Sequence, residues 1–188
     1  MTKPRYRTLP GDAAWWMFLT AEFLTLGIFF VAFAFSRQGN LEVFEQGKAM
    51  LNPDVGFLNT LVLITSGFFA ARGVASIEKK ESAKTRLWLM LAAVLGVIFL
   101  AIKTWEYVGK FEAGINLSTS SYFFFYFFLT GFHYLHVVLG VGFLGVMAWR
   151  CGRQGATEAN TRNVASSAAF WHMLDLVWVV LFPLLYLA

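Results

Sequence analysis

The sequence predicts an all-α integral membrane protein, a bundle of five transmembrane helices, and three observations support this fold class. Of the 188 residues, 58% are hydrophobic and only 14% are charged, whereas a soluble domain is nearer half apolar and a quarter charged. Five apolar stretches reach the roughly 20 residues that a helix needs to cross the hydrocarbon core. The basic residues also gather in alternate connections, as a polytopic protein requires.

The five expected helices form a single transmembrane domain over residues 1–188, with short connections between them. They cover about Ala13–Phe35, Val55–Ile77, Leu87–Val108, Tyr122–Trp149 and Val164–Leu187. Asp12 is placed to cap the first helix. The second and fourth contain small residues, in "TSG" at 65–67 and "LGVGFLG" at 139–145, that favour close helix packing. The fourth is the longest, so we expect it to tilt or project. Pro183 should kink or loosen the end of the fifth.

Lys and Arg predict the orientation of the bundle. Eleven cluster on one side, in the N-terminal segment and the second and fourth connections: Lys3, Arg5, Arg7, Arg72, Lys79, Lys80, Lys84, Arg86, Arg150, Arg153 and Arg162. The other side carries four, Arg37, Lys48, Lys103 and Lys110. The positive-inside rule places the N-terminus in the cytoplasm and the C-terminus in the periplasm. We therefore expect a multi-pass protein of a bacterial inner membrane.

Seven ionisable side chains fall within or near the apolar spans, where each should face protein or water and have a partner. They are Glu22, Lys103, Glu106, His133, His136, His172 and Asp175. Residues three apart share a helix face, so Lys103 can pair with Glu106, and His172 can meet Asp175. These positions are the candidate buried polar and proton-related residues.

Glu22 is the most informative single residue, because no cation lies within one helical turn of it. By depth, its candidate partners are His136 on the fourth helix and His172 on the fifth. We expect Glu22 to be protonated at neutral pH or to share a proton with one of these histidines. A neutral carboxyl that only holds helices together is an equally good interpretation.

Three roles are open for the histidines: metal or haem ligation, proton transfer, and hydrogen bonding between helices. Haem between His172 and His133 or His136 is conceivable. A di-iron site would need more carboxylates and two Glu-x-x-His motifs, which the sequence lacks. Hydrogen bonding between helices is the favoured role, and we assign no metal ligand and no catalytic residue to this chain.

Five segments together resemble subunit III of the haem–copper oxidases, in the same order: "FLTAEFLTLGIFFVAF", "GFLNTLVLITSG", "KTWEY", "FFLTGFHYLHVVLGV" and "FWHMLDLVWVVLFPLLY". The resemblance covers the chain from Asp12 onward. Long members of that family have seven helices, and this chain has the five-helix form. The segments "LPGDAAWWMFLTAE", "EVFEQGKAMLN" and "LNTLVLITSG" look most like the NorE type, which is encoded with nitric oxide reductases.

The resemblance implies an accessory subunit without haem or metal of its own, which stabilises a haem-containing catalytic subunit and binds phospholipid between its helices. Glu22 matches the family's membrane-buried carboxylate, which is linked to proton uptake and carbodiimide reactivity. Glu106, His133, His136, His172 and Asp175 match its other polar motif positions, whereas Lys103 departs from the pattern.

We therefore expect a non-catalytic subunit of a nitric oxide reductase in denitrification, with a cytochrome c or quinol oxidase as the alternative respiratory-chain partner. A standalone proton-coupled transporter and a small b-type cytochrome are the rivals from other classes. The candidates for lipid headgroup binding are the basic residues of the second connection, Arg72, Lys79, Lys80, Lys84 and Arg86. Arg72 is the best single candidate, because it lies closest to the helix end and can extend toward the headgroups.

Overall fold

The computed structural model describes residues 13–187, and all regular elements in that range are helical. They are α1 (Ala13–Gly39), α2 (Leu41–Ala49), α3 (Pro53–Glu78), α4 (Ser82–Glu112), α5 (Ser121–Gln154), α6 (Glu158–Phe182) and a π-helical continuation (Pro183–Leu187). All but α2 belong to five helices that are long and apolar enough to cross a membrane. Each predicted span lies inside one of these five. The cap Asp12 and the basic residues Lys3, Arg5 and Arg7 lie outside the described residues.

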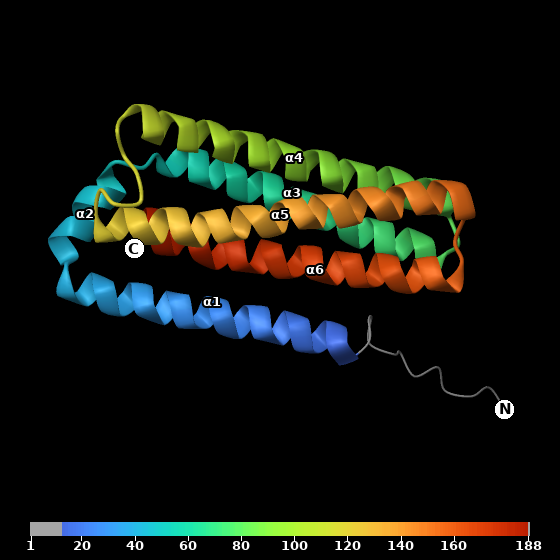
Figure 1. Cartoon of the computed structure of the whole chain (residues 1–188). Helices are drawn as coiled ribbons and strands as arrows, with labels where there is room; N and C mark the ends of the chain where they lie inside the picture. The colour runs from blue at the N-terminus through green and yellow to red at the C-terminus, as the bar shows by residue number, and fades with distance from the viewer. Residues whose placement is uncertain (1–12, 188) are drawn as a thin grey trace.

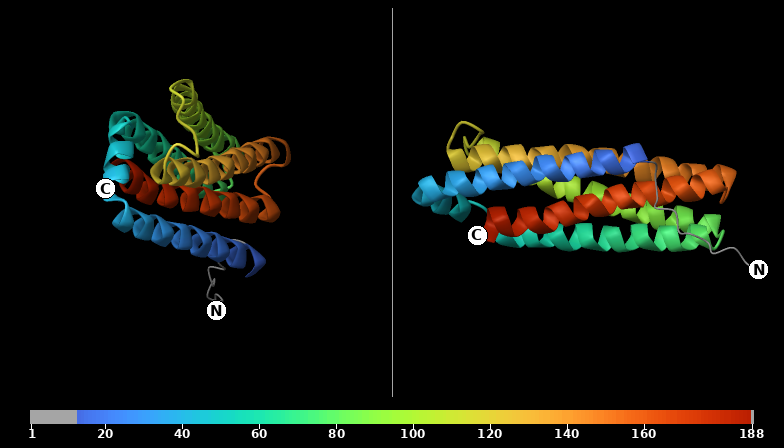
Figure 2. Two further views of the ribbon diagram at one scale, coloured as in Figure 1. Left: turned by 60° about the vertical axis from the view of Figure 1, so that its left-hand side comes forward. Right: turned by 90° about the horizontal axis from the view of Figure 1, so that it is seen from below.

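Helices α3, α4, α5 and α6 form a four-helix bundle, and α1 lies along one side of it (Figure 1). The further views in Figure 2 show α1 as the outlying helix, joined to the bundle through α2. Only Leu19, Leu26 and Phe33 of α1 are buried, at intervals of seven residues. This spacing gives α1 one narrow contact stripe, which packs mainly against α5.

The helix ends follow local sequence signals. Asn52 accepts a hydrogen bond from the Asp54 amide (3.0 Å), and Pro53 fills the first position of α3, where a missing N–H costs nothing. Ser120 caps α5 and Thr157 caps α6 through their side-chain oxygens. α5, with 34 residues, is the longest helix, as predicted. At about 1.5 Å per residue it exceeds the roughly 30 Å hydrocarbon core.

Helix α2 fills a connection in which the sequence predicted no helix. Phe44 contacts the rings of Phe33 and Tyr122 edge-on. A Cβ at Gly47 would lie 2.3 Å from the Tyr122 ring, so only glycine allows this approach. α2 therefore anchors the far end of α1 to the start of α5.

Glycines permit close packing at some of the predicted positions. A Cβ at Gly140 would lie 2.7 Å from the Trp171 ring, and one at Gly67 would lie 2.0 Å from Asp175 Oδ2. Gly142 and Gly145 have open space instead.

At Pro183 the α-helical geometry of α6 ends and the π-helical segment begins, because proline offers no N–H to continue the α-helical ladder.

Candidate functional site

Lys103 and Glu106 pair, as their spacing predicts, with Nζ 3.0 Å from Oε2. Their burial is greater than expected for a pair near the membrane interface, since Lys103 is fully buried. Lys103 Nζ also donates to the hydroxyls of Tyr126 (3.0 Å) and Tyr186 (2.7 Å). Both hydroxyls in turn donate to Glu106 Oε1 at 2.7 Å. The three ammonium protons and both carboxylate oxygens therefore have partners.

This closed network joins α4, α5 and the π-helical segment. Aromatic rings surround the ammonium group, with the Tyr126 centroid 4.7 Å and the Trp178 ring 5.4 Å from Nζ. Tyr122 adds a hydrogen bond from its hydroxyl to the Leu185 carbonyl (2.6 Å). A buried charge needs such a complete set of partners. We therefore interpret the network as a structural one that holds these three helical segments together.

Glu22 and His136 are brought together between α1 and α5, with Oε2 3.3 Å from Nε2. The two atoms are in ion-pair range, although their alignment does not make a hydrogen bond. His136 Nδ1 lies 2.8 Å from the Phe132 carbonyl oxygen. A carbonyl only accepts, so Nδ1 carries a proton, and Nε2 of a neutral ring is then an acceptor facing Glu22.

His172 and Asp175 also meet, with Nδ1 3.3 Å from Oδ2. The carboxyl group lies against Gly67 of α3, and Asp175 Oδ1 is buried without a hydrogen-bond partner among residues 13–187. The His172 side chain is 43% exposed. His172 is therefore partly exposed on α6, and it pairs with Asp175 and not with Glu22.

His133 does not make the predicted hydrogen bond between helices. Its ring is buried, and neither ring nitrogen has a partner within the described part of the chain. It stacks on Trp178 (5.3 Å between ring centroids) and meets the edge of Phe99. Contacts with these two aromatic rings hold this histidine in the core.

Several polar members of the core were not predicted from the sequence. Tyr126 and Tyr186 complete the Lys103 network, and Trp178 Nε1 donates to Thr60 Oγ1 at 3.0 Å. These partners lie 23, 83 and 118 residues apart in sequence. No local pattern signals such contacts, although buried tyrosine and tryptophan generally find a hydrogen-bond partner.

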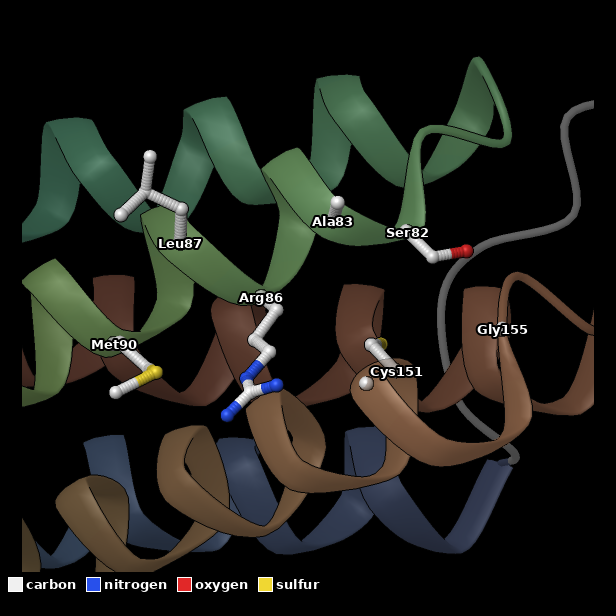
Figure 3. Close-up of a pocket in the computed structure, with 8 residues that line it drawn as sticks. Ser82, Ala83, Arg86, Leu87, Met90, Cys151 and Gly155 are labelled. Atoms are coloured by element: carbon white, nitrogen blue, oxygen red, sulfur yellow. The ribbon is translucent and has the colours of Figure 1, made fainter.

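The basic connection between α3 and α4 borders a groove of about 500 Å³ between α4 and α5 (Figure 3). Its lining is Ser82, Ala83, Arg86, Leu87, Met90, Cys151, Gly152 and Gly155. Among the described residues no carboxylate lies within ion-pair distance of Arg86. Arg72, the candidate favoured from sequence, instead lies over the Trp88 ring at 5.4 Å, and Lys84 pairs with Glu81. Of the five candidates, Arg86 is the one that lines this groove.

Metal ligation has no geometric support in the described range. No three His, Cys, Asp or Glu side chains of residues 13–187 gather closely enough to hold an ion. His172 pairs with Asp175, and His136 with Glu22.

The chain has clear relatives among known proteins. The family model "Cytochrome c oxidase subunit III" matches residues 12–188. The chain is 33% identical to cytochrome c oxidase subunit 3 of Thermostichus vulcanus over 172 residues, 91% of this chain and 84% of the relative. It is 33% identical to the Synechocystis protein of the same name, over 91% of this chain and 72% of that one. A probable quinol oxidase subunit 3 of Staphylococcus saprophyticus is 24% identical, over 92% of this chain and 86% of the relative.

Proposed function

The chain belongs to the cytochrome c oxidase subunit III family, and from that premise we propose that it is a non-catalytic accessory subunit of a haem–copper oxidoreductase. The observation that carries the proposal is the family match over residues 12–188. The buried ion pair of Lys103 and Glu106, whose carboxylate also accepts from Tyr126 and Tyr186, fits a structural role in such a subunit. The catalytic haem and metal would belong to the partner.

Two partner classes follow from different observations. The relatives named above are subunits of cytochrome c and quinol oxidases, which favours an oxidase. The segments "LPGDAAWWMFLTAE" and "EVFEQGKAMLN" favour a nitric oxide reductase through their resemblance to NorE-type proteins. Tagged chain, purified in mild detergent, should bring down a haem-containing membrane polypeptide.

Consumption of oxygen or of nitric oxide by that preparation assigns the partner class. Recovery of the chain alone, together with proton flux after reconstitution in liposomes, would instead favour a transporter that uses Glu22 and His136. A Soret band that tracks the isolated chain and disappears in His172→Ala would overturn the proposal in favour of a cytochrome.

The proposal includes an orientation, with the connections at 79–81 and 155–157 in the cytoplasm and the C-terminus in the periplasm of a bacterial inner membrane. The described helices support opposite sides for the two ends, since α1 begins at one end of the bundle and the π-helical segment ends at the other (Figure 1). The direction rests on the excess of Lys and Arg at the first of these ends.

We also propose that the groove beside Arg86 binds an anionic phospholipid. A Cβ at Gly152 would lie 3.0 Å from Arg86 Cδ, so the glycine makes room for the arginine stem. The exposed side chains of Leu87 and Met90 line the same groove, so acyl chain and headgroup phosphate would both find complementary surfaces. A cation near the membrane surface contributes about 1 kcal/mol to such binding.

Native mass spectrometry of chain prepared with phosphatidylglycerol tests this site. Arg86→Gln should retain less lipid than the wild type, whereas Lys79→Gln, outside the groove lining, should match it. Equal retention by the two variants would leave the basic cluster with a role in topology alone.

A further inference from the structure

His172 of α6 is partly exposed at a depth where the surrounding lipid has no hydrogen-bonding group. His172 is midway along the apolar helix Glu158–Leu187, which has 30 residues. At about 1.5 Å per residue, it is roughly 20 Å from either end of that helix. The hydrocarbon core extends about 15 Å to each side of the membrane centre. The 43% exposed imidazole therefore opens onto the middle of the membrane.

An imidazole in hydrocarbon is costly unless both ring nitrogens have partners. Nδ1 of His172 faces Asp175 Oδ2, and this is the ring's one hydrogen bond within residues 13–187. The carboxyl is held in place by the close approach of Gly67. Whichever atom carries the shared proton, the fixed pair presents Nε2 as a single directional polar group on the surface.

The surface around His172 is otherwise apolar. Leu176, Val179 and Val180 are 59%, 43% and 48% exposed, and their spacing from His172 puts them on the same side of α6. On α3, Ile64 is 48% exposed, one turn before Gly67. An apolar strip with one hydrogen-bonding atom at its end is a surface that a transmembrane helix with one polar side chain complements.

We propose that the α6 strip of His172, Leu176, Val179 and Val180, with Ile64 of α3 beside it, docks a transmembrane helix of the haem-containing catalytic subunit. A hydrogen-bonding side chain of that helix pairs with His172 Nε2. An acyl chain has no group that can make this bond, and the headgroups lie too far away. The inference rests on the proposed function, because it requires a membrane-embedded partner.

Photo-crosslinking in the intact complex tests the docking surface. p-Benzoyl-phenylalanine in place of Leu176 should form an adduct with the haem-containing polypeptide. The same amino acid in place of Val94, a 54% exposed residue of α4, is the matched control and should label lipid. An adduct with a second copy of this chain, or with lipid alone, at position 176 would overturn the proposal.

Two substitutions separate docking from folding. His172→Gln keeps a hydrogen-bonding group and should copurify with the partner at wild-type stoichiometry. His172→Phe removes it, so recovery of the partner should fall several-fold while the isolated chain keeps its thermal stability in detergent. Unchanged recovery of the partner with His172→Phe would overturn the proposed docking surface and leave the proposed function standing. If wild-type chain brings down no haem-containing polypeptide, the proposed function falls with it.

Discussion

At His136, one hydrogen bond decides which atoms share the proton in the contact with Glu22. Because Nδ1 donates to the Phe132 carbonyl, the contact between Nε2 and Oε2 holds a single proton. It is either a carboxylic acid facing a neutral ring or a carboxylate facing an imidazolium. A site between two helices within the membrane disfavours separated charge, so we expect the neutral arrangement.

Infrared spectroscopy should detect that arrangement. The wild-type chain at neutral pH should show a protonated carboxyl C=O band that is lost in Glu22→Gln, and an apolar carbodiimide should modify Glu22 in preference to Glu42 and Glu45. Glu22→Gln should preserve assembly. Glu22→Ala removes the partner of His136 and should cost roughly 1–3 kcal/mol of stability. Absence of the band would mean that the pair is ionic.

Whether Glu22 takes part in proton uptake has a separate readout. If Glu22→Gln leaves turnover and proton uptake of the whole complex at wild-type values over time, the residue only holds α1 to α5. The family assignment does not depend on that result.

Lys103 provides a second prediction at the level of the residue. Lys103→Met leaves the Glu106 carboxylate buried beside two hydroxyls, and breaking one side of a buried ion pair costs about 3–5 kcal/mol. Lys103→Met combined with Glu106→Gln removes both charges, so it should be less damaging than the single change. Unfolding of the isolated chain in detergent measures the stability of both variants. If Lys103→Met were as stable as the wild type, the ion pair would not hold the helices together.

Candidate polar residues could be identified from the sequence only where the partner is near in sequence or restricted by depth. The spacing of three predicted that Lys103 meets Glu106, and depth limited the partners of Glu22 to His136 and His172. Tyr186 approaches Lys103 from 83 residues away, which no helical periodicity encodes. Likewise, the sequence does not indicate that neither ring nitrogen of His133 has a hydrogen-bond partner among residues 13–187, because this depends on how the core packs.

At the level of the element, helices that cross a membrane are easy to recognise because each must satisfy its own backbone hydrogen bonds over a long apolar run. α2 has only nine residues and lies outside the apolar runs, so the search for long apolar stretches did not predict it. It is held by tertiary contacts, namely Phe44 against α1 and α5, and Glu45 with Arg37 of α1.

The Glu45 contacts make the corner between α1 and α2 sensitive to acid. Hydrogen bonds from Lys48 and then Arg37 lower the pKa of Glu45 below its usual value of 4.5. A carboxyl with a lowered pKa stabilises the folded state above its unfolded pKa, and this stabilisation disappears as pH falls through the folded value. A nitroxide spin label replacing the exposed Gln46 should therefore gain mobility below about pH 4.5. In Glu45→Gln the mobility should be independent of pH, and a label that responds equally in both would exclude this cause.

For the whole molecule, the structure changes how the basic residues are counted. Lys103 belongs to the side with four cations, yet it is buried and paired with Glu106, so it cannot oppose the positive-inside signal. Arg37 and Lys48 on that side also face Glu45. At the opposite end the second connection carries five cations, Arg72, Lys79, Lys80, Lys84 and Arg86, and the expected direction of insertion rests on the excess of Lys and Arg there.

Cysteine labelling in intact cells can read that direction. In a Cys151→Ser background, we expect a membrane-impermeant maleimide to label Leu117→Cys, an exposed position between α4 and α5, and not Lys79→Cys between α3 and α4. Inside-out vesicles should reverse the pattern, because the two connections lie on opposite sides of the membrane. Labelling of Lys79→Cys in intact cells would invert the proposed orientation while leaving the five-helix fold intact. Arg86 and its groove would then face the periplasmic leaflet.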